Sequence, residues 1–464
     1  MTTWGHENAY DRRRADPHRV AQRYEASRRQ IVILVMTVFW MIVLEGAVRK
    51  WLFPEFHRVI LFARDPVLLA AYVLALKDGY LRPNAPLFLF AMVTLLGAPI
   101  LLSLQILTSP YEFNPVLAGY GWRNYVLYAP LIHVIAETFR KEDLDRVFRH
   151  VLFLAVLSAP LMAAQVQADP FDPINIGTGN TDEETFANLG LALGIARATG
   201  FFTSSNGSYI FSVTAFAIAL GLWLRAPRDR NCRMPLLAAG TVAAVVCVFL
   251  SGNRGSIVHV GIILLCGYLA SAFLVTQHKR MRMTLSPLLL LALAGSVLPL
   301  FFPAVYDAFV YRFISAQADE EQVYAFGLFG RALRQFTTFI PALSDTPVFG
   351  YGLGYGTNAA VLLNLLPLYL QPEDDWHRHV VDLGPALGLV IIIGRIVLVA
   401  WLGAATIAAI RKGNDPMPLA LFGLVALPLL AGQITGHSTL NGFTWLFAGA
   451  LWAMTRRHVG KGRR

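Results

Sequence analysis

The chain has 464 residues, of which 56% are hydrophobic and only 15% are charged. Soluble domains carry roughly 25% charged residues, so this composition excludes an ordinary soluble protein and indicates an integral membrane protein. The net charge of +10 lies mainly in short connections between apolar runs, so we expect no nucleic-acid partner. The three cysteines predict no disulfide framework, because two lie in apolar runs and one lies in a basic connection.

The first 30 residues are polar and rich in arginine, which predicts a cytoplasmic basic segment over residues 1–30 without a cleavable signal peptide. The apolar runs that follow are each long enough to cross a bilayer as one helix. We count about twelve of them, at residues 31–48, 59–76, 87–108, 116–136, 150–166, 207–224, 235–251, 256–275, 285–304, 383–410, 417–435 and 439–455.

The sequence therefore predicts an all-α polytopic membrane protein of about 12 transmembrane helices. Helices one to nine are expected within residues 31–304, and a long outside region is expected over residues 305–382. Helices ten to twelve and a basic C-terminal tail are expected over residues 383–464. Long polar segments between spans are uncommon unless they have a function, so we expect residues 305–382 to form the catalytic region.

The distribution of lysine and arginine predicts the orientation. With the N-terminus in the cytoplasm, the inside connections hold about three times as many of these cations as the outside ones. Both termini are then cytoplasmic, and the two long connections, 167–206 and 305–382, face outside. The basic inside surface is suited to contact with anionic lipid.

Several charged residues lie in or near the predicted spans. Glu45 and Arg49 are spaced for an ion pair on one helical face. Arg64, Asp65 and Arg123 are predicted within spans two and four, where charges are costly and often functional. An ion pair between these helices is the structural alternative.

Two outside turns carry polar side chains. The segment from Arg197 to Gly207, with Thr203-Ser204-Ser205-Asn206, predicts a turn followed by a helix N-cap, and its amide and hydroxyl groups could instead bind sugar hydroxyls. The run Leu250-Ser251-Gly252-Asn253-Arg254-Gly255-Ser256 predicts a tight hairpin. Arg254 is then held at the outer membrane surface, where its guanidinium group can bind phosphate. The structural alternative is an arginine that only extends its charged end to the membrane–water interface.

The long outside region contains three further patterns. Arg331 and Arg334 would share one face of a helix. The glycines from Gly350 to Gly356 permit close approach of the backbone. The acidic run Glu373-Asp374-Asp375 offers a general base if one carboxylate is desolvated, and otherwise it is a solvated loop.

The chain has no metal-ligand spacing of the zinc type, since His377 and His379 have no further cysteine or histidine nearby. It also has no phosphate-binding loop motif. We expect no metal and no cofactor.

Taken together, these patterns resemble a known family. Ser251-Gly-Asn-Arg254-Gly255, Gly330-Arg331 with Pro347-Val-Phe-Gly350-Tyr-Gly352-Leu-Gly354, and Asp382-Leu-Gly384-Pro-Ala-Leu-Gly388 are similar to motifs of the O-antigen ligase and O-antigen polymerase superfamily. The members of this superfamily are glycosyltransferases of the bacterial envelope. The resemblance covers roughly residues 195–410.

The resemblance implies transfer of a glycan from an undecaprenyl-diphosphate-linked donor to a glycan or lipid acceptor, at the outer face of the bacterial inner membrane. It implies that Arg254 and Arg331 bind phosphate. Where many members carry a histidine–asparagine pair, this chain has Glu373-Asp374, so Glu373 is the candidate base and His377 is the alternative. Arg197, Arg334 and Asn206 are further candidates for substrate binding.

Two other classes of function fit the same topology. A transporter or flippase of lipid-linked sugars would also use many spans and buried charges, but its polar groups should lie near the middle of the membrane. A non-catalytic component of a polysaccharide-export complex would make Arg254 and Arg331 dispensable. The position of the motifs at the outer face favours the enzyme.

Overall fold

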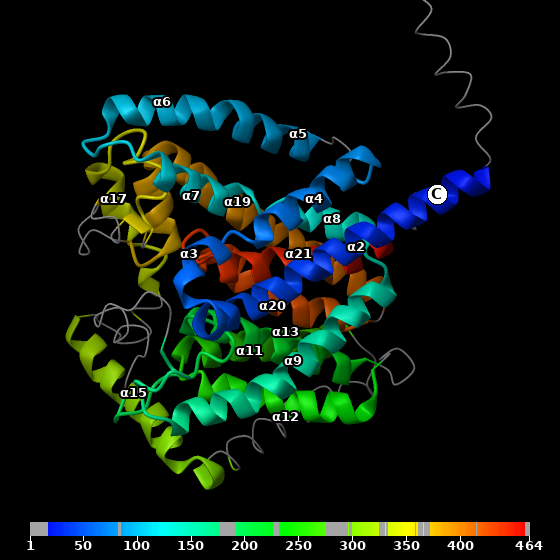
Figure 1. The fold of residues 1–464 in the computed structure, drawn as a ribbon, viewed down its shortest axis with the longest axis vertical. Helices are drawn as coiled ribbons and strands as arrows, with labels where there is room; N and C mark the ends of the chain where they lie inside the picture. Colours follow the sequence, from blue (N-terminus) through cyan, green and yellow to red (C-terminus); the bar gives the residue numbers. More distant parts are fainter. Residues whose placement is uncertain are drawn as a thin grey trace, which may run out of the picture.

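The computed structural model is all-helical in the part of the chain that it describes (Figure 1). The described residues are 17–81, 85–176, 192–225, 232–274, 296, 299–323, 330, 333–357, 359–360, 365, 372–413 and 415–459. Within them, the extended structure amounts to one isolated bridge between Ala192 and Ile195.

The N-terminal half begins with α2 (Pro17–Ala47), a π-helical turn (Val48–Leu52) and the short helix α3 (His57–Ile60). It continues with α4 (Arg64–Lys77), α5 (Ala85–Met92), α6 (Ala98–Thr108), α7 (Pro115–Val126), α8 (Leu131–Thr138) and α9 (Lys141–Gln167).

The C-terminal half contains α11 (Ser205–Leu224), α12 (Met234–Leu250), α13 (Arg254–Leu274), α15 (Pro303–Val323) and α17 (Phe339–Asp345). It ends with α19 (Asp375–Gly413), α20 (Met417–Ala431) and α21 (Ser438–Val459).

Helix α11 is the centre of the bundle. It packs against α9, α12, α13, α20 and α21, and nearly every residue from Ile210 to Leu222 is buried. By contrast, α6 and α19 expose apolar side chains such as Leu107 and Val390. A bundle that is apolar both inside and on its outer surface is expected in lipid.

Five described helices are long and apolar enough to cross a membrane: Ala21–Leu52, Phe88–Thr108, Lys141–Gln167, Ser205–Leu224 and Asp375–Gly413. These helices support the predicted class, a multi-pass membrane protein. The described helices do not show the full set of twelve spans. The predicted span 116–136 is divided into α7 and α8, and most of the predicted span 285–304 lies outside the described residues.

The connections gather at two ends of the bundle. At one end, Arg225 at the end of α11 binds Asp145 of α9 and Asp415 before α20. At the other end, Lys50 donates to Thr199.

Residues 305–382, which the sequence predicts to face outside, are partly helical. Helices α15 and α17 lie within it, and α19 begins at Asp375, before the predicted span at 383. The backbone of α19 is broken at Gly384, which has a φ of 82°. A β-carbon at Gly384 would lie 2.1 Å from the carbonyl oxygen of Val348. The glycine therefore allows α19 to contact the segment from Val348 to Gly356, which we call the glycine-rich turn.

Candidate functional site

The hairpin between α12 and α13 forms as the sequence predicts. Gly252 adopts a φ of 58°, which favours glycine. The side-chain oxygen of Asn253 accepts a hydrogen bond of 2.9 Å from the backbone nitrogen of Gly255. This turn places Arg254 at the first position of α13, at the end of the bundle where Ala198 meets Leu250.

Arg254 lies beside two other arginines. Its Nη1 donates to the carbonyl oxygen of Arg312 on α15 at 3.4 Å, and Arg312 Nη2 donates to the carbonyl oxygen of Ile195 at 2.8 Å. A β-carbon on Gly252 would lie 2.9 Å from Arg312 Nη1 and 3.1 Å from Arg197 Cγ. Arg197, Arg254 and Arg312 therefore converge on one turn, and we call them the arginine cluster.

The electrostatics of the arginine cluster favour an anion. Burial and the neighbouring Arg254 lower the pKa of Arg197. Burial, Arg197 and Arg254 together lower the pKa of Arg312 to about 10, so this side chain, only 7% exposed, is still cationic at neutral pH. Like charges held this close repel one another, and a bound polyanion would relieve that repulsion.

The sequence analysis identified Arg197 and Arg254 but missed Arg312. Arg312 is a lone cation in the aromatic run of α15, with no motif around it. Arg331 lies outside the described residues. Arg334 is exposed and precedes the short helix α17. Its part in substrate binding stays a prediction.

The acidic run separates into three different environments. Glu373 is exposed, and its backbone oxygen accepts from Gln433 Nε2. Asp374 is half-buried and accepts a hydrogen bond of 3.2 Å from Thr338 Oγ1. Asp375 is fully buried. His377 follows on the first turn of α19 and is half-buried. The run is thus not a uniformly solvated loop.

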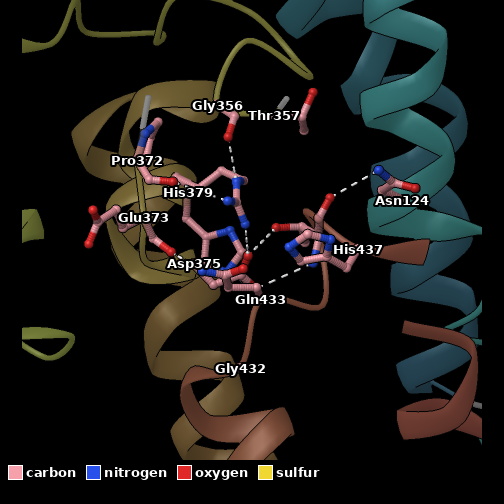
Figure 2. Close-up of polar contacts among 12 residues, drawn as sticks. Asn124, Gly356, Thr357, Pro372, Glu373, Asp375, His379, Gly432, Gln433 and His437 are labelled. Carbon is pink, nitrogen blue, oxygen red and sulfur yellow. Dashed lines mark hydrogen bonds and ion pairs between the residues drawn. The ribbon is translucent and has the colours of Figure 1, made fainter. Parts of the chain in front are cut away.

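Asp375 is the centre of a buried polar network (Figure 2). Its Oδ1 accepts from Arg378 Nη1 at 2.5 Å and from Thr435 Oγ1 at 2.6 Å. Its Oδ2 accepts from Arg395 Nη1 at 2.6 Å. Arg378 Nε also donates to the carbonyl oxygen of Gly356 at 2.5 Å. This network joins α19, the glycine-rich turn and the connection between α20 and α21.

A chain of hydrogen bonds extends from this network. Arg395 Nη1 lies 2.7 Å from His379 Nε2, so Nε2 must be the acceptor, and the proton of the neutral imidazole is then on Nδ1. His379 Nδ1 lies 2.9 Å from the hydroxyl of Tyr125, which donates to Asp382 Oδ2 at 3.2 Å. Asp382 Oδ1 accepts from Gly356 N at 2.7 Å. The network thus joins two carboxyl groups, Asp375 and Asp382, to two guanidinium groups, Arg378 and Arg395.

The glycine-rich turn approaches other backbone closely, as predicted. A β-carbon on Gly350 would lie 2.6 Å from the Asp382 carbonyl carbon, and one on Gly354 would lie 2.5 Å from the Leu117 oxygen. Tyr351 N also donates to Val381 O at 2.8 Å. The two glycine motifs are therefore in contact with each other.

The connection between α20 and α21 contacts two of the predicted site residues, Glu373 and Asn206. Gln433 contacts Glu373, and His437 Nε2 lies 2.9 Å from Asn206 Nδ2 on α11. Burial and the nearby Arg378 lower the pKa of His437 to about 4, so His437 is neutral at physiological pH. The sequence analysis missed His437, although its topology placed this residue outside. The sequence predicts that the segment from Arg197 to Gly207 ends in a helix N-cap; the N-cap residue of α11 is Ser204, and its side chain makes no capping hydrogen bond.

The predicted contact between Glu45 and Arg49 is present, and Asp65 and Arg123 form the ion pair between helices that was the structural alternative. Arg123 holds Asp65 with two hydrogen bonds, of 2.5 and 2.8 Å. Glu45 contacts Arg49 and Arg64 at 3.3 Å each. These charged groups therefore have structural partners across helices.

Comparison of the chain with protein-family models, with curated proteins and with solved structures found no match. Within the described residues there is no group of three or more histidine, cysteine, aspartate or glutamate side chains placed to hold a metal ion.

Proposed function

We propose that the protein is a membrane glycosyltransferase. It transfers or polymerises a glycan from an undecaprenyl-diphosphate-linked donor to a glycan or lipid acceptor at the outer face of the bacterial inner membrane. The observation that carries this proposal is the arginine cluster, in which three partly or fully buried guanidinium groups converge on one turn. A departing lipid diphosphate needs fixed positive charge where negative charge develops.

The acceptor hydroxyl needs a base. Glu373 is exposed, and its backbone oxygen accepts from Gln433 in the connection that also carries His437. His437 in turn contacts Asn206 of α11, so we assign the role of base to Glu373. Asp375 is not suited to it, because both of its oxygens accept from arginine and threonine donors. Arginine stays cationic at neutral pH, so the proposed chemistry uses no metal and no cofactor.

Purified protein in liposomes with an undecaprenyl-diphosphate-linked glycan and an acceptor tests this function. Arg312→Ala should reduce transfer by roughly 30-fold or more, which corresponds to one lost charge-assisted contact of about 2 kcal/mol. The matched control is Arg411→Ala at an exposed arginine without an assigned role, for which no loss is expected. Wild-type transfer by Arg312→Ala, or no transfer by the wild-type protein, would contradict the proposal.

The proposal includes twelve spans with both termini in the cytoplasm, as the basic residues favour. In a variant lacking Cys232, Cys247 and Cys266, a single cysteine at Glu373 should react with an impermeant maleimide in intact spheroplasts. A single cysteine at the exposed Lys412 should react only after lysis. The opposite pattern would place the arginine cluster on the cytoplasmic side and overturn the orientation.

One observation favours a second candidate, a transporter of lipid-linked sugars. The break of α19 at Gly384 resembles the discontinuous helices of transporters. A transporter would move the intact lipid-linked glycan across the liposome membrane without releasing undecaprenyl diphosphate. Movement of intact donor by protein that never cleaves it would favour this second candidate.

A further inference from the structure

An apolar groove lies between α12, α13 and α15, with a volume of about 320 Å³. Its walls are almost entirely hydrocarbon, with Phe216 of α11 at its base. The other walls include Phe249 of α12, Ile257, Gly261 and Leu264 of α13, and Phe309 and Phe313 of α15. Phe309 packs against Phe249 and Phe313, with ring centroids 5.7 and 4.9 Å away. Pockets that bind small molecules begin at about 300 Å³, so the groove can hold part of a long chain.

The helices α12, α13 and α15 all reach the arginine cluster: α12 and α13 are joined by the hairpin before Arg254, and α15 carries Arg312. On α13, Arg254 is followed at helical spacing by Ile257, Gly261 and Leu264, so cation and apolar wall share one stripe. The stripe from Arg254 to Leu264 extends for about 15 Å along the helix. On α15, Arg312 lies between Phe309 and Phe313. The groove is thus apolar along its length and has the cationic arginine cluster at one end.

This combination fits an amphiphile with a strongly anionic head. A free phosphate compound has no hydrocarbon to bury in the groove. An uncharged lipid has no negative charge to pair with the three guanidinium groups. We infer that the groove holds the first part of the hydrocarbon chain of the lipid diphosphate whose head lies in the arginine cluster. The inference rests on the proposed function, which supplies the donor, and it adds the surface that aligns the donor.

Gly261 offers a direct test, because a β-carbon at this position would have no atom within 4 Å. The side chain of Gly261→Leu would start in open space and occupy part of the groove. Gly394 of α19 is a matched control, since it is exposed, also has open space at its β-carbon, and does not line the groove. Both substitutions place the same side chain at an open position of an apolar helix.

Binding of undecaprenyl diphosphate to the purified full-length protein is measured, together with its displacement by inorganic diphosphate. Gly261→Leu should weaken lipid binding about tenfold, since the displaced chain loses burial of one to two methylene groups. Inorganic diphosphate should bind this variant as it binds the wild-type protein, and Gly394→Leu should match the wild-type protein with both probes.

The outcomes separate this inference from the proposed function. If Gly261→Leu binds undecaprenyl diphosphate normally while Arg254→Ala does not, the groove is wrong and the arginine site stands. If inorganic diphosphate fails to compete in the wild-type protein, the arginine site itself is wrong. If phosphatidylglycerol displaces undecaprenyl diphosphate equally well, the groove is a general lipid site and the assignment fails.

A second measurement needs no variant. Undecaprenyl diphosphate that carries a photoreactive group in its first isoprene units should crosslink to α13 or α15 of the wild-type protein. Crosslinks confined to other helices would overturn the inference even if Gly261→Leu failed to fold.

Discussion

Asp375→Asn is expected to destabilise the folded protein by about 3–5 kcal/mol, the usual effect of removing one partner from a buried ion pair. The asparagine keeps the shape of the side chain but loses the charge that Arg378 and Arg395 share, at 2.5 and 2.6 Å. Since Asp375 is 0% exposed, water cannot replace the lost charge. The start of α19 should separate from the connection between α20 and α21, where Thr435 also binds Asp375.

Thermal unfolding of the detergent-solubilised protein measures this effect, and Glu373→Gln is the matched control. Glu373 lies two residues away and is exposed, so its neutralisation should leave the unfolding temperature near that of the wild-type protein. Under the proposed function, Glu373→Gln should still stop transfer while the donor remains bound. Equal stability of Asp375→Asn and Glu373→Gln would show that the buried network does not hold the fold.

The sequence predicted those features that depend on local patterns. Hydropathy predicts the helical, membrane-spanning class, and the spacing of Glu45 and Arg49 predicts their contact. Glycine and asparagine predict the tight turn before Arg254, and the glycine motifs predict the close approach that the structure shows at Gly350. Each of these follows from a few consecutive residues and from the conformations that they allow.

The sequence could not predict features that arise from long-range contacts. Arg312 joins Arg197 and Arg254 only because α15 crosses the end of the α12–α13 hairpin. Similarly, nothing in the run Glu373-Asp374-Asp375 distinguishes the exposed carboxylate from the buried one. The burial of Asp375 depends on Arg395, which lies twenty residues further along α19.

Arg254→Lys is expected to reduce transfer nearly as much as Arg254→Ala, by roughly 30- to 1000-fold for a lost contact of about 2–4 kcal/mol. Lysine keeps the charge, but it is a point charge and cannot bind phosphate with two parallel hydrogen bonds. It also loses the contact from Arg254 Nη1 to the carbonyl oxygen of Arg312. Since Arg197 and Arg312 remain, weak binding of the donor should persist.

Initial rates in liposomes, measured over a range of donor concentrations, check this expectation. Arg411→Lys at an exposed position at the end of α19 is the matched control, and it should keep the wild-type rate because the proposal gives Arg411 no part in binding the donor. If Arg254→Lys transfers at the wild-type rate while Arg254→Ala does not, then charge alone suffices. The arginine cluster would in that case attract the diphosphate by its electrostatic potential rather than hold the phosphate oxygens in a fixed geometry.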